Sequence, residues 1–447
     1  MGVAMTDPMT DPTTDPTPAD PDGTAAPRRR FCLRTRVQFG LIAVIALATM
    51  LATWQFKQAG DSYQDAVAEE LKLQTAVQEV ARYVYADEAP LAFRVAAAAA
   101  RAEALGPLRD DGRLAASEFA LAEQEAVAFQ GRARPESLVG SDRYLDAQRG
   151  YDVPRRLGDQ EERQPADQRL APGETMAEGD RWALWGRVSL ALAAAAILAA
   201  LAAANVLRPE AWRIPPPSAG GPRRLLRGID PVPQPATAPP DRRGGTRLHL
   251  LAVGLLFLLP LLQLAAAGGE QRAQAEASRH ALRLGAAIVA SGQRSAFLTQ
   301  AVTASQAADI HAAAREIAVL YEKDSPAVRH ERAVAAAETD HASRLRAMAE
   351  HMGRAPEAAD GVSAASVAAL RSGSEDWPGM RAEQNRHKDL ADAAGDRGLY
   401  LAAAAALAAA AEVLAAAFLE AGRLSRMVWP TGLAAVSIGV TAWALVA

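Results

Sequence analysis

Five apolar segments constrain this chain of 447 residues more than any other feature. A helix needs about 20 predominantly apolar residues to cross the hydrocarbon core of a bilayer. The segments that meet this requirement are 37–54, 188–207, 248–267, 399–419 and 427–447. Polar sequence separates them. We therefore expect an all-α, polytopic membrane protein with five transmembrane helices, whose first partner is the lipid bilayer.

The segment 399–419 is the weakest of the five when it is considered alone. Twelve of its residues are Ala, which is close to neutral for insertion. Its Leu, Val and Phe residues together contribute roughly −3 kcal/mol, and one acid in mid-helix costs about the same amount. A short loop leads to the segment 427–447, so we expect the two to insert together as a hairpin. An alanine-rich soluble helix is the alternative interpretation.

The placement of arginine predicts how the chain is oriented. Arginines cluster before the first segment, between the second and third, and in the loop before the fifth. All three clusters fall on one side if every segment crosses, and such loops stay cytoplasmic. We expect a cytoplasmic N-terminus and an extracytoplasmic C-terminus. A cleaved signal peptide is the alternative for 37–54, but no small-residue cleavage site follows Trp54, which favours an uncleaved anchor.

Repeated short motifs indicate an internal duplication. Gly-Asp-Arg occurs at 179–181 and at 395–397, each time before an alanine-rich segment. Thr-Arg precedes the first and third segments by similar offsets. We predict a first unit at 35–207 and a second at 247–421, arranged as parallel repeats. Within each Gly-Asp-Arg motif, the Asp is expected to cap the start of a helix.

Between the apolar segments, the chain divides into regions of different composition. Residues 1–34 are rich in Pro, Thr and Asp and predict a disordered cytoplasmic tail, and 208–246 predicts a Pro- and Arg-rich cytoplasmic linker. The two outer regions, 57–187 and 268–398, are expected to lie outside the cytoplasm and to be helical.

Apolar residues at helical spacing support the prediction of helical, coiled-coil-like outer regions. Three stripes have this spacing and are expected to be buried: Leu73, Val77, Val80 and Val84; Ile310, Ala314, Ile317 and Tyr321; and His341, Leu345, Met348 and Met352.

Glu412 is the sharpest single candidate, because an ionisable residue inside a membrane helix is a functional candidate by default. It would serve a small transporter or channel as a proton relay or ion ligand. No acidic or basic partner is evident deep in another segment. His249 lies near the cytoplasmic end of the third segment, and Gln263 lies near its outer end. A neutral packing role is the simpler interpretation.

Glu338 and His341 form the second candidate pair, with the Glu-x-x-His spacing of di-iron helical bundles. A metal site would need a second such pair and two more acids. We therefore expect a polar pair in a helical core, and neither a metal nor any other cofactor.

Composition and motifs exclude several classes of function. The formal net charge of −4 gives no reason to expect nucleic-acid binding. The single cysteine, Cys32, excludes an intrachain disulfide. Phosphate-binding loops, nucleophile elbows and His-Glu-x-x-His motifs are not found, so we expect no enzyme and assign no catalytic residue.

The stretch DAAGDRGLYLAAAAALAAAAEVLAAAF, followed by Arg423 and the last segment, resembles uncharacterised bacterial multi-pass membrane proteins built from a span, a helical outer region and a span. This resemblance implies topology only. Our hypothesis is a non-enzymatic membrane protein whose outer regions serve assembly, scaffolding or sensing at the cell envelope, through self-association or other envelope proteins. A transporter or channel that uses Glu412 is the alternative.

Overall fold

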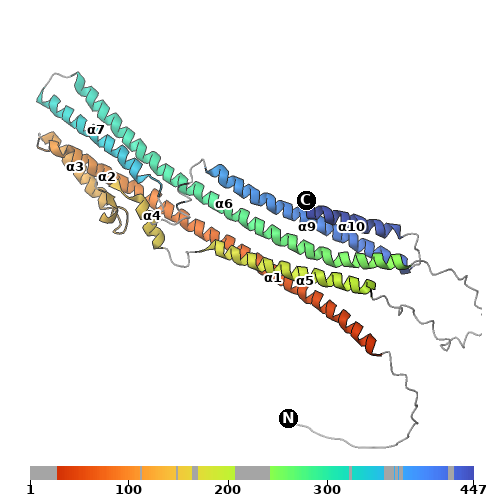
Figure 1. The fold of residues 1–447 in the computed structure, drawn as a ribbon. Coiled ribbons are helices and arrows are strands. Elements are labelled where there is room, and N and C mark those ends of the chain that lie inside the picture. Colours follow the sequence, from red (N-terminus) through yellow and green to blue (C-terminus); the bar gives the residue numbers. More distant parts are fainter. Residues whose placement is uncertain are drawn as a thin grey trace, which may run out of the picture.

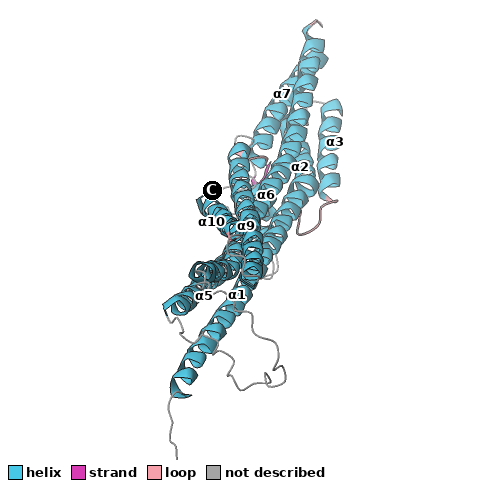
Figure 2. Ribbon diagram, turned by 90° about the vertical axis from the view of Figure 1, so that its right-hand side faces the viewer, coloured by secondary structure: helices cyan, strands magenta, loops and turns pink. Residues whose placement is uncertain are grey.

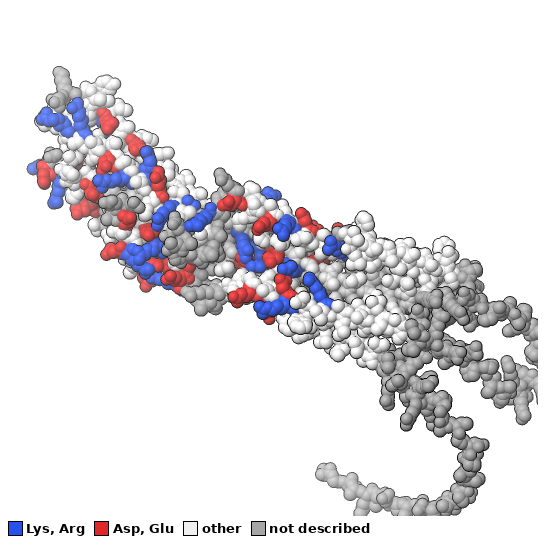
Figure 3. All heavy atoms as spheres, in the orientation of Figure 1, with Lys and Arg blue, Asp and Glu red and all other residues white. Residues whose placement is uncertain are grey.

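The chain forms one elongated bundle of helices (Figure 1). The computed structural model describes residues 28–110, 113–146, 150–163, 170–206, 242–321, 325–356, 376–420 and 427–446, and positions 367 and 371. Charged side chains cover the upper part of the rod in Figure 3, and one end is nearly free of them. That contrast divides the rod into an apolar part and a charged outer part.

Helices account for almost all of the described residues, so the predicted all-α class is confirmed. The helices are α1 (Arg28–Arg82), the π-helix η1 (Tyr83–Glu88), α2 (Ala89–Leu105), α3 (Arg113–Gln130), α4 (Val153–Glu162), α5 (Pro172–Val206), α6 (Arg242–Leu320), α7 (Pro326–Met352), α9 (Trp377–Glu420) and α10 (Val428–Val446). Two 3₁₀ turns, η2 (Gly106–Leu108) and η3 (Asp142–Tyr144), and the antiparallel strands β1 (Leu145–Asp146) and β2 (Gly150–Tyr151) complete the outer part.

Five of these helices, α1, α5, α6, α9 and α10, are long and apolar enough to cross a membrane. Each covers all or nearly all of one of the five segments predicted from hydropathy. α1, α5, α6 and α9 extend well beyond those segments, and α1 and α6 continue without a break into the outer part. The chain is therefore a membrane-type protein with a helical rod that projects from its apolar end.

Two helical hairpins and one added helix form the apolar end. α1 packs against α5, α6 packs against α9, and α10 returns along α9. The start of α1, the end of α5, the start of α6, the end of α9 and the start of α10 all lie at the same end of the bundle (Figures 1 and 2). The helix ends that neighbour the arginine-rich segments in the sequence therefore lie together.

Large apolar side chains point outward along the apolar end. Ile42, Leu47, Met50, Phe257 and Val436 are among those that the bundle leaves exposed. A soluble protein seldom exposes so continuous an apolar surface, because each such residue would lose the free energy of burial. Lipid chains are the surroundings that suit this surface.

The alanine-rich stretch of α9 packs with its small side chains facing inward. Ala404, Ala408, Ala411 and Ala415 are fully buried along one face. The buried Ser437 of α10 donates a hydrogen bond of 2.8 Å to the carbonyl oxygen of Ala404. Small residues and interhelical hydrogen bonds are the usual means of packing helices in lipid, where no hydrophobic effect drives association. Partner helices thus support the segment that is weak alone.

Phe56 of α1 lies where three helices approach each other closely. Its ring contacts Gly186 of α5 and Gly268 of α6. A Cβ atom on Gly186 would lie 2.9 Å from the ring, and one on Gly268 would lie 2.7 Å from it. Both distances are too short for real carbon contacts, so glycine is required on both sides of Phe56.

The long helix that begins as α1 changes to π geometry at η1 and continues as α2. Pro90 explains the change, because proline lacks an N–H and its ring clashes with the preceding turn. The wider turn brings Glu88 inward, where Nε and Nη2 of the buried Arg156 each donate a hydrogen bond of 2.8 Å. The amide of Leu138 donates a third bond of 3.2 Å. Glu88 thereby anchors α4 and the adjoining loop to the long helix.

The outer core confirms two of the three predicted stripes. In the first stripe, Val77, Val80 and Val84 are buried and Leu73 is half-buried, and all four residues of the stripe that begins at His341 are buried. The stripe of Ile310, Ala314, Ile317 and Tyr321 is exposed, so its predicted burial is wrong. α6 packs α7 and α2 against its other face, and Tyr321 is 90% exposed at the tip.

Three boundaries or roles differ from the prediction. Residues 28–34 belong to α1 and not to a tail, and residues 242–246 belong to α6 and not to the linker. The remaining parts of the predicted tail and linker, with Arg423, lie outside the described residues. Asp180 and Asp396 do not cap helices, because α5 begins at Pro172 and α9 begins at Trp377, well before them. The internal duplication stays a prediction, although both halves order a long helix, a shorter antiparallel helix and a return helix in the same way.

Candidate functional site

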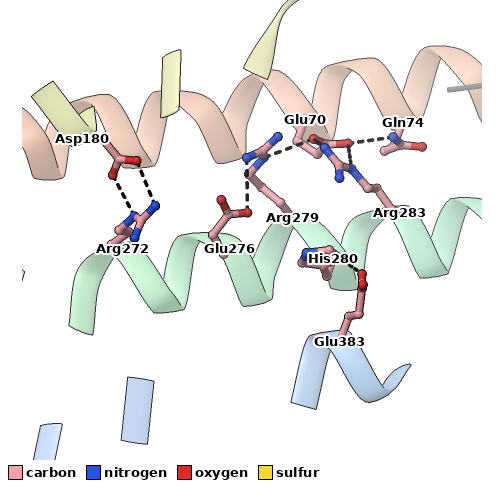
Figure 4. Close-up of polar contacts among 9 residues, drawn as sticks. All are labelled: Glu70, Gln74, Asp180, Arg272, Glu276, Arg279, His280, Arg283 and Glu383. Carbon is pink, nitrogen blue, oxygen red and sulfur yellow. Dashed lines mark hydrogen bonds and ion pairs between the residues drawn. The ribbon is translucent and has the colours of Figure 1, made fainter. Parts of the chain in front are cut away.

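A cluster of charged residues joins the helices just beyond the apolar end, and we call it the juxtamembrane network (Figure 4). It consists of Glu70 and Gln74 from α1, Asp180 from α5, Arg272, Glu276, Arg279, His280 and Arg283 from α6, and Glu383 from α9. α6 supplies most of these side chains. The network therefore connects the two hairpins through one helix.

Glu70 is the centre of the network and is fully buried. Arg283 donates two hydrogen bonds to it, from Nε to Oε1 at 2.9 Å and from Nη2 to Oε2 at 2.8 Å. Arg279 adds a bond of 3.2 Å from Nε, and Gln74 adds one of 2.8 Å. A buried carboxylate is tolerated only when it is paired and fully hydrogen-bonded, and Glu70 meets this condition.

The electrostatics of Glu70 and Arg283 favour the charged form of both groups. Burial by itself raises the pKa of Glu70, but the hydrogen bonds from Arg283 and Gln74 and the charges of Arg283 and Arg279 outweigh burial, and the pKa lies below its usual value. The hydrogen bond to Glu70 raises the pKa of Arg283. The two groups therefore form a permanent ion pair between α1 and α6 at physiological pH.

Asp180 links three helices in a second arm of the network. Arg272 of α6 binds it through two guanidinium nitrogens, at 2.7 Å from Nε to Oδ1 and 2.9 Å from Nη2 to Oδ2. The hydroxyl of Tyr63 on α1 donates a bond of 3.0 Å to Oδ1. Gly179 lets α5 approach the ring of Tyr63, since a Cβ there would lie 2.5 Å from a ring carbon. The first Gly-Asp-Arg motif thus supplies a close approach and an ion pair.

His280 forms the third arm and faces α9. Its Nδ1 atom lies 3.6 Å from a carboxylate oxygen of Glu383, and its ring stacks on that of His387 at 5.1 Å. Burial lowers the pKa of His280, and the charges of Arg283 and His387 lower it further against the opposing effect of Glu383 and Glu276. The His280 ring is therefore neutral at pH 7 and becomes charged only on acidification.

No protein-family model, curated protein or solved structure matches the chain. Its function must therefore be argued from its own geometry.

Glu412 lies in α9, where sequence analysis placed it, and an ionisable side chain of a neighbouring helix lies near it. Nδ1 of His249 on α6 lies 3.8 Å from a carboxylate oxygen of Glu412. The distance is too long for a hydrogen bond and short enough for an ion pair if His249 is protonated. Because His249 lies near the arginine-flanked end of its segment, Glu412 sits toward that end and not at the centre of the apolar part.

Glu338 and His341 lie together on α7, as predicted for a polar pair within a helical core. Both are largely buried. Arg101 of α2 donates two bonds to Oε1 of Glu338, of 3.1 Å from Nε and 2.8 Å from Nη2. Burial lowers the pKa of His341, so the ring is neutral near pH 7, and its Nδ1 atom is buried without a partner. In the described part of the chain, no three His, Cys, Asp or Glu residues are grouped as a metal site requires.

Sequence reasoning missed the whole juxtamembrane network. Glu70 and Arg279 are separated by 209 residues, so no local spacing connects them. One signal was available, because charged residues directly beyond antiparallel apolar segments must meet at the same level of the bundle. Arranged in this way, the network can hold helices in register and can respond to protonation.

Proposed function

We propose that this chain is a non-enzymatic integral membrane protein whose extracytoplasmic helical rod senses a ligand or condition of the cell envelope. The arginine-flanked end of the bundle is placed in the cytoplasm, and the charged rod outside it, because arginine-rich loops are retained inside. The sensed signal travels along the helices to the cytoplasmic end.

The observation that carries this proposal is the continuity of two helices. α1, η1 and α2 form one helical path from Arg28 to Leu105, and α6 runs from Arg242 to Leu320. Each path contains an apolar segment and reaches the outer part. A shift or rotation of such a helix at its outer end therefore also moves its apolar segment. The ion pair of Glu70 and Arg283 joins the two paths at a level between the apolar segments and the outer part.

Hydrogen exchange tests this transmission in the full-length protein in lipid nanodiscs. Arg101→Gln removes the ion pair with Glu338 in the outer part. Exchange is expected to change beyond the outer part, in the juxtamembrane residues 172–187 and 377–398. Arg163→Gln is the matched control, because it removes an exposed pair with Glu136. A change confined to the outer part contradicts transmission.

The exposed apolar stripe supports assembly as the second role of the rod. Ile310 is 68% exposed and Leu320 is 69% exposed on the same helix. Such residues on an outer tip favour contact with a second copy of the chain or with another envelope protein. Ile310→Asp with Ile317→Asp is expected to lower the oligomeric mass in detergent. An unchanged monomeric mass in both proteins removes this role.

Transport is the second candidate function, and the pair of His249 and Glu412 is the observation that favours it. Two ionisable groups that face each other between membrane helices can bind or relay a proton. Proton flux into proteoliposomes under a pH gradient provides the test. A transporter requires a large loss of flux in Glu412→Gln, and equal flux in liposomes with and without the protein excludes this function.

A further inference from the structure

An open groove crosses the outer part between four helices. Its volume is about 600 Å³, within the range of about 300–1,000 Å³ that small-molecule sites occupy. The floor is made of alanines from α2 and α6, namely Ala97, Ala98, Ala304, Ala307 and Ala308. These short side chains leave the space that larger residues would fill.

The walls of the groove carry ionisable side chains: Arg94 and Arg101 from α2, Glu125 from α3, His311 and Arg315 from α6, and Glu338 and His341 from α7. Three arginines oppose two glutamates, so the lining has an excess of positive charge. Arg101 is engaged by Glu338, and Arg315 has only long contacts of 3.4 Å with Glu118. Within the described residues, nothing pairs with Arg94.

A smaller apolar pocket adjoins the groove. It has a volume of about 110 Å³, and it shares Arg94, Ala97 and Ala304 with the groove. Phe93 and Phe297 form its walls, and their rings meet edge to face at 6.4 Å. The pocket is smaller than the apolar cavity of about 150 Å³ that holds a benzene ring, so it suits one compact apolar group no larger than such a ring.

A second observation favours a ligand at this groove. His341 lines the groove, and only 6% of the residue is exposed. Its Nδ1 atom has no hydrogen-bond partner. Buried polar atoms of folded proteins are nearly always paired, so an unpaired one in the wall of a cavity indicates that a ligand or ordered water completes the site.

We propose that this groove binds a small carboxylic acid that carries one compact apolar group. The carboxylate binds to Arg94, since guanidinium groups bind carboxylates through paired hydrogen bonds, and the apolar group enters the pocket that Phe93 and Phe297 line. Arg315 and His341 complete the polar wall. This inference names the class of ligand that the proposed sensor binds. Binding itself does not depend on the proposed function, whereas the signal that binding produces does.

Phenylacetate serves as the probe, and calorimetry on the full-length protein in nanodiscs measures its binding. Phenylacetate is expected to bind, whereas phenylacetamide and inorganic phosphate are expected to bind at least about tenfold more weakly, because one lacks the charge and the other lacks the apolar group. Equal binding of either compound, or no binding of phenylacetate to the folded protein, overturns the proposal.

Three variants locate the binding site. Arg94→Gln removes the charge that binds the carboxylate, and Ala304→Leu fills the junction between the groove and the apolar pocket. Each is expected to weaken binding about tenfold. Arg346→Gln is the control, because Arg346 pairs with Asp309 away from the groove lining. Unchanged affinity in the first two variants overturns the proposal.

Hydrogen exchange separates this inference from the sensing role. If phenylacetate binds and Arg94→Gln weakens this binding, but exchange at 172–187 does not change, the binding site is supported and transmission is contradicted. If phenylacetate does not bind, but Arg101→Gln alters exchange at 172–187, the binding site is contradicted and transmission is supported.

Discussion

Arg283 of α6 donates two hydrogen bonds to the fully buried carboxylate of Glu70 on α1, at 2.9 and 2.8 Å. The two residues come from different hairpins, and their contact lies between the apolar end and the outer part of the rod. With the bonds from Arg279 and Gln74, Glu70 accepts more hydrogen bonds than any other carboxylate described in the juxtamembrane network. The proposed coupling of the two long helices depends on this pair.

Glu70→Gln is expected to destabilise the protein by about 3 kcal/mol, because the buried Arg279 loses one of its two charged partners and keeps only the contact of 3.3 Å with Glu276. The lower part of the usual range applies because Arg283 is partly exposed and retains contact with water. Chemical denaturation in detergent measures the change. Glu136→Gln serves as control, with a loss below about 1 kcal/mol, since its ion pair is on the surface. Equal losses in both variants contradict a structural role for Glu70.

Gly268→Ala is expected to cost about 1–3 kcal/mol, because the new methyl group would overlap the ring of Phe56. Gly269→Ala is an ideal neighbour for comparison, since a Cβ there meets nothing within 4 Å. The melting temperatures of the two variants provide the measurement. A double-mutant cycle with Phe56→Ala must recover much of the loss in Gly268→Ala. Additive losses would show that the close approach at Phe56 is not the cause.

Stability is expected to fall as the pH decreases below about 6.5, the ordinary pKa of histidine. The pKa of His280 is lowered by burial and by the charges of Arg283 and His387, against Glu383 and Glu276. The unfolded chain therefore binds a proton first, and stability is complete above the unfolded pKa and is lost as the pH falls toward the folded one. His341 acts in the same direction, because burial and the charges of Arg101 and Arg344 lower its pKa, against Glu338 and Asp340.

Melting temperatures measured between about pH 7.5 and pH 5.5 test this sign, in a window above the pKa of the carboxylates. His280→Gln should flatten the profile, and adding His341→Gln should flatten it further. A wild-type melting temperature that rises on acidification, or a profile that neither substitution alters, is inconsistent with these pKa directions.

Arg156→Met is expected to destabilise the outer part by about 3–5 kcal/mol, because it leaves the buried charge of Glu88 unpaired in the π-helix. Limited proteolysis of the loop between α3 and α4 should accelerate. The double variant Glu88→Met with Arg156→Met is expected to lose less than Arg156→Met alone, since no buried charge is left. A larger loss in the double variant is the contrary result.

Hydropathy predicted the five apolar helices and the all-α class because insertion depends on local composition. The helical outer regions were also predictable, since the stripes of Val77 and Leu345 follow the period of a helix. The periodicity around Ile310 was as regular, but it gives only the side of a helix that is apolar. It does not show which side the neighbouring helices cover, and here they cover the other.

The ion pairs were beyond sequence reasoning because their partners are far apart in the chain. Glu338 was singled out for its spacing to His341, yet its partner is Arg101, 237 residues away. Glu412 was expected to lack a partner deep in another segment, and Nδ1 of His249 on another helix lies 3.8 Å from its carboxylate. Asp180 was misassigned for a different reason, since α5 begins well before the apolar segment and leaves Asp180 inside the helix.

The account as a whole depends on the chain crossing a membrane with its rod outside, and labelling of single cysteines in intact cells tests this most directly. Cys32→Ser removes the one native cysteine. In that background, Ser343→Cys in the outer part is expected to react with a membrane-impermeant maleimide, and Ser218→Cys in the predicted linker is expected to react only after permeabilisation. Labelling of Ser218→Cys but not Ser343→Cys in intact cells, or recovery of the protein in the soluble fraction, would contradict the account.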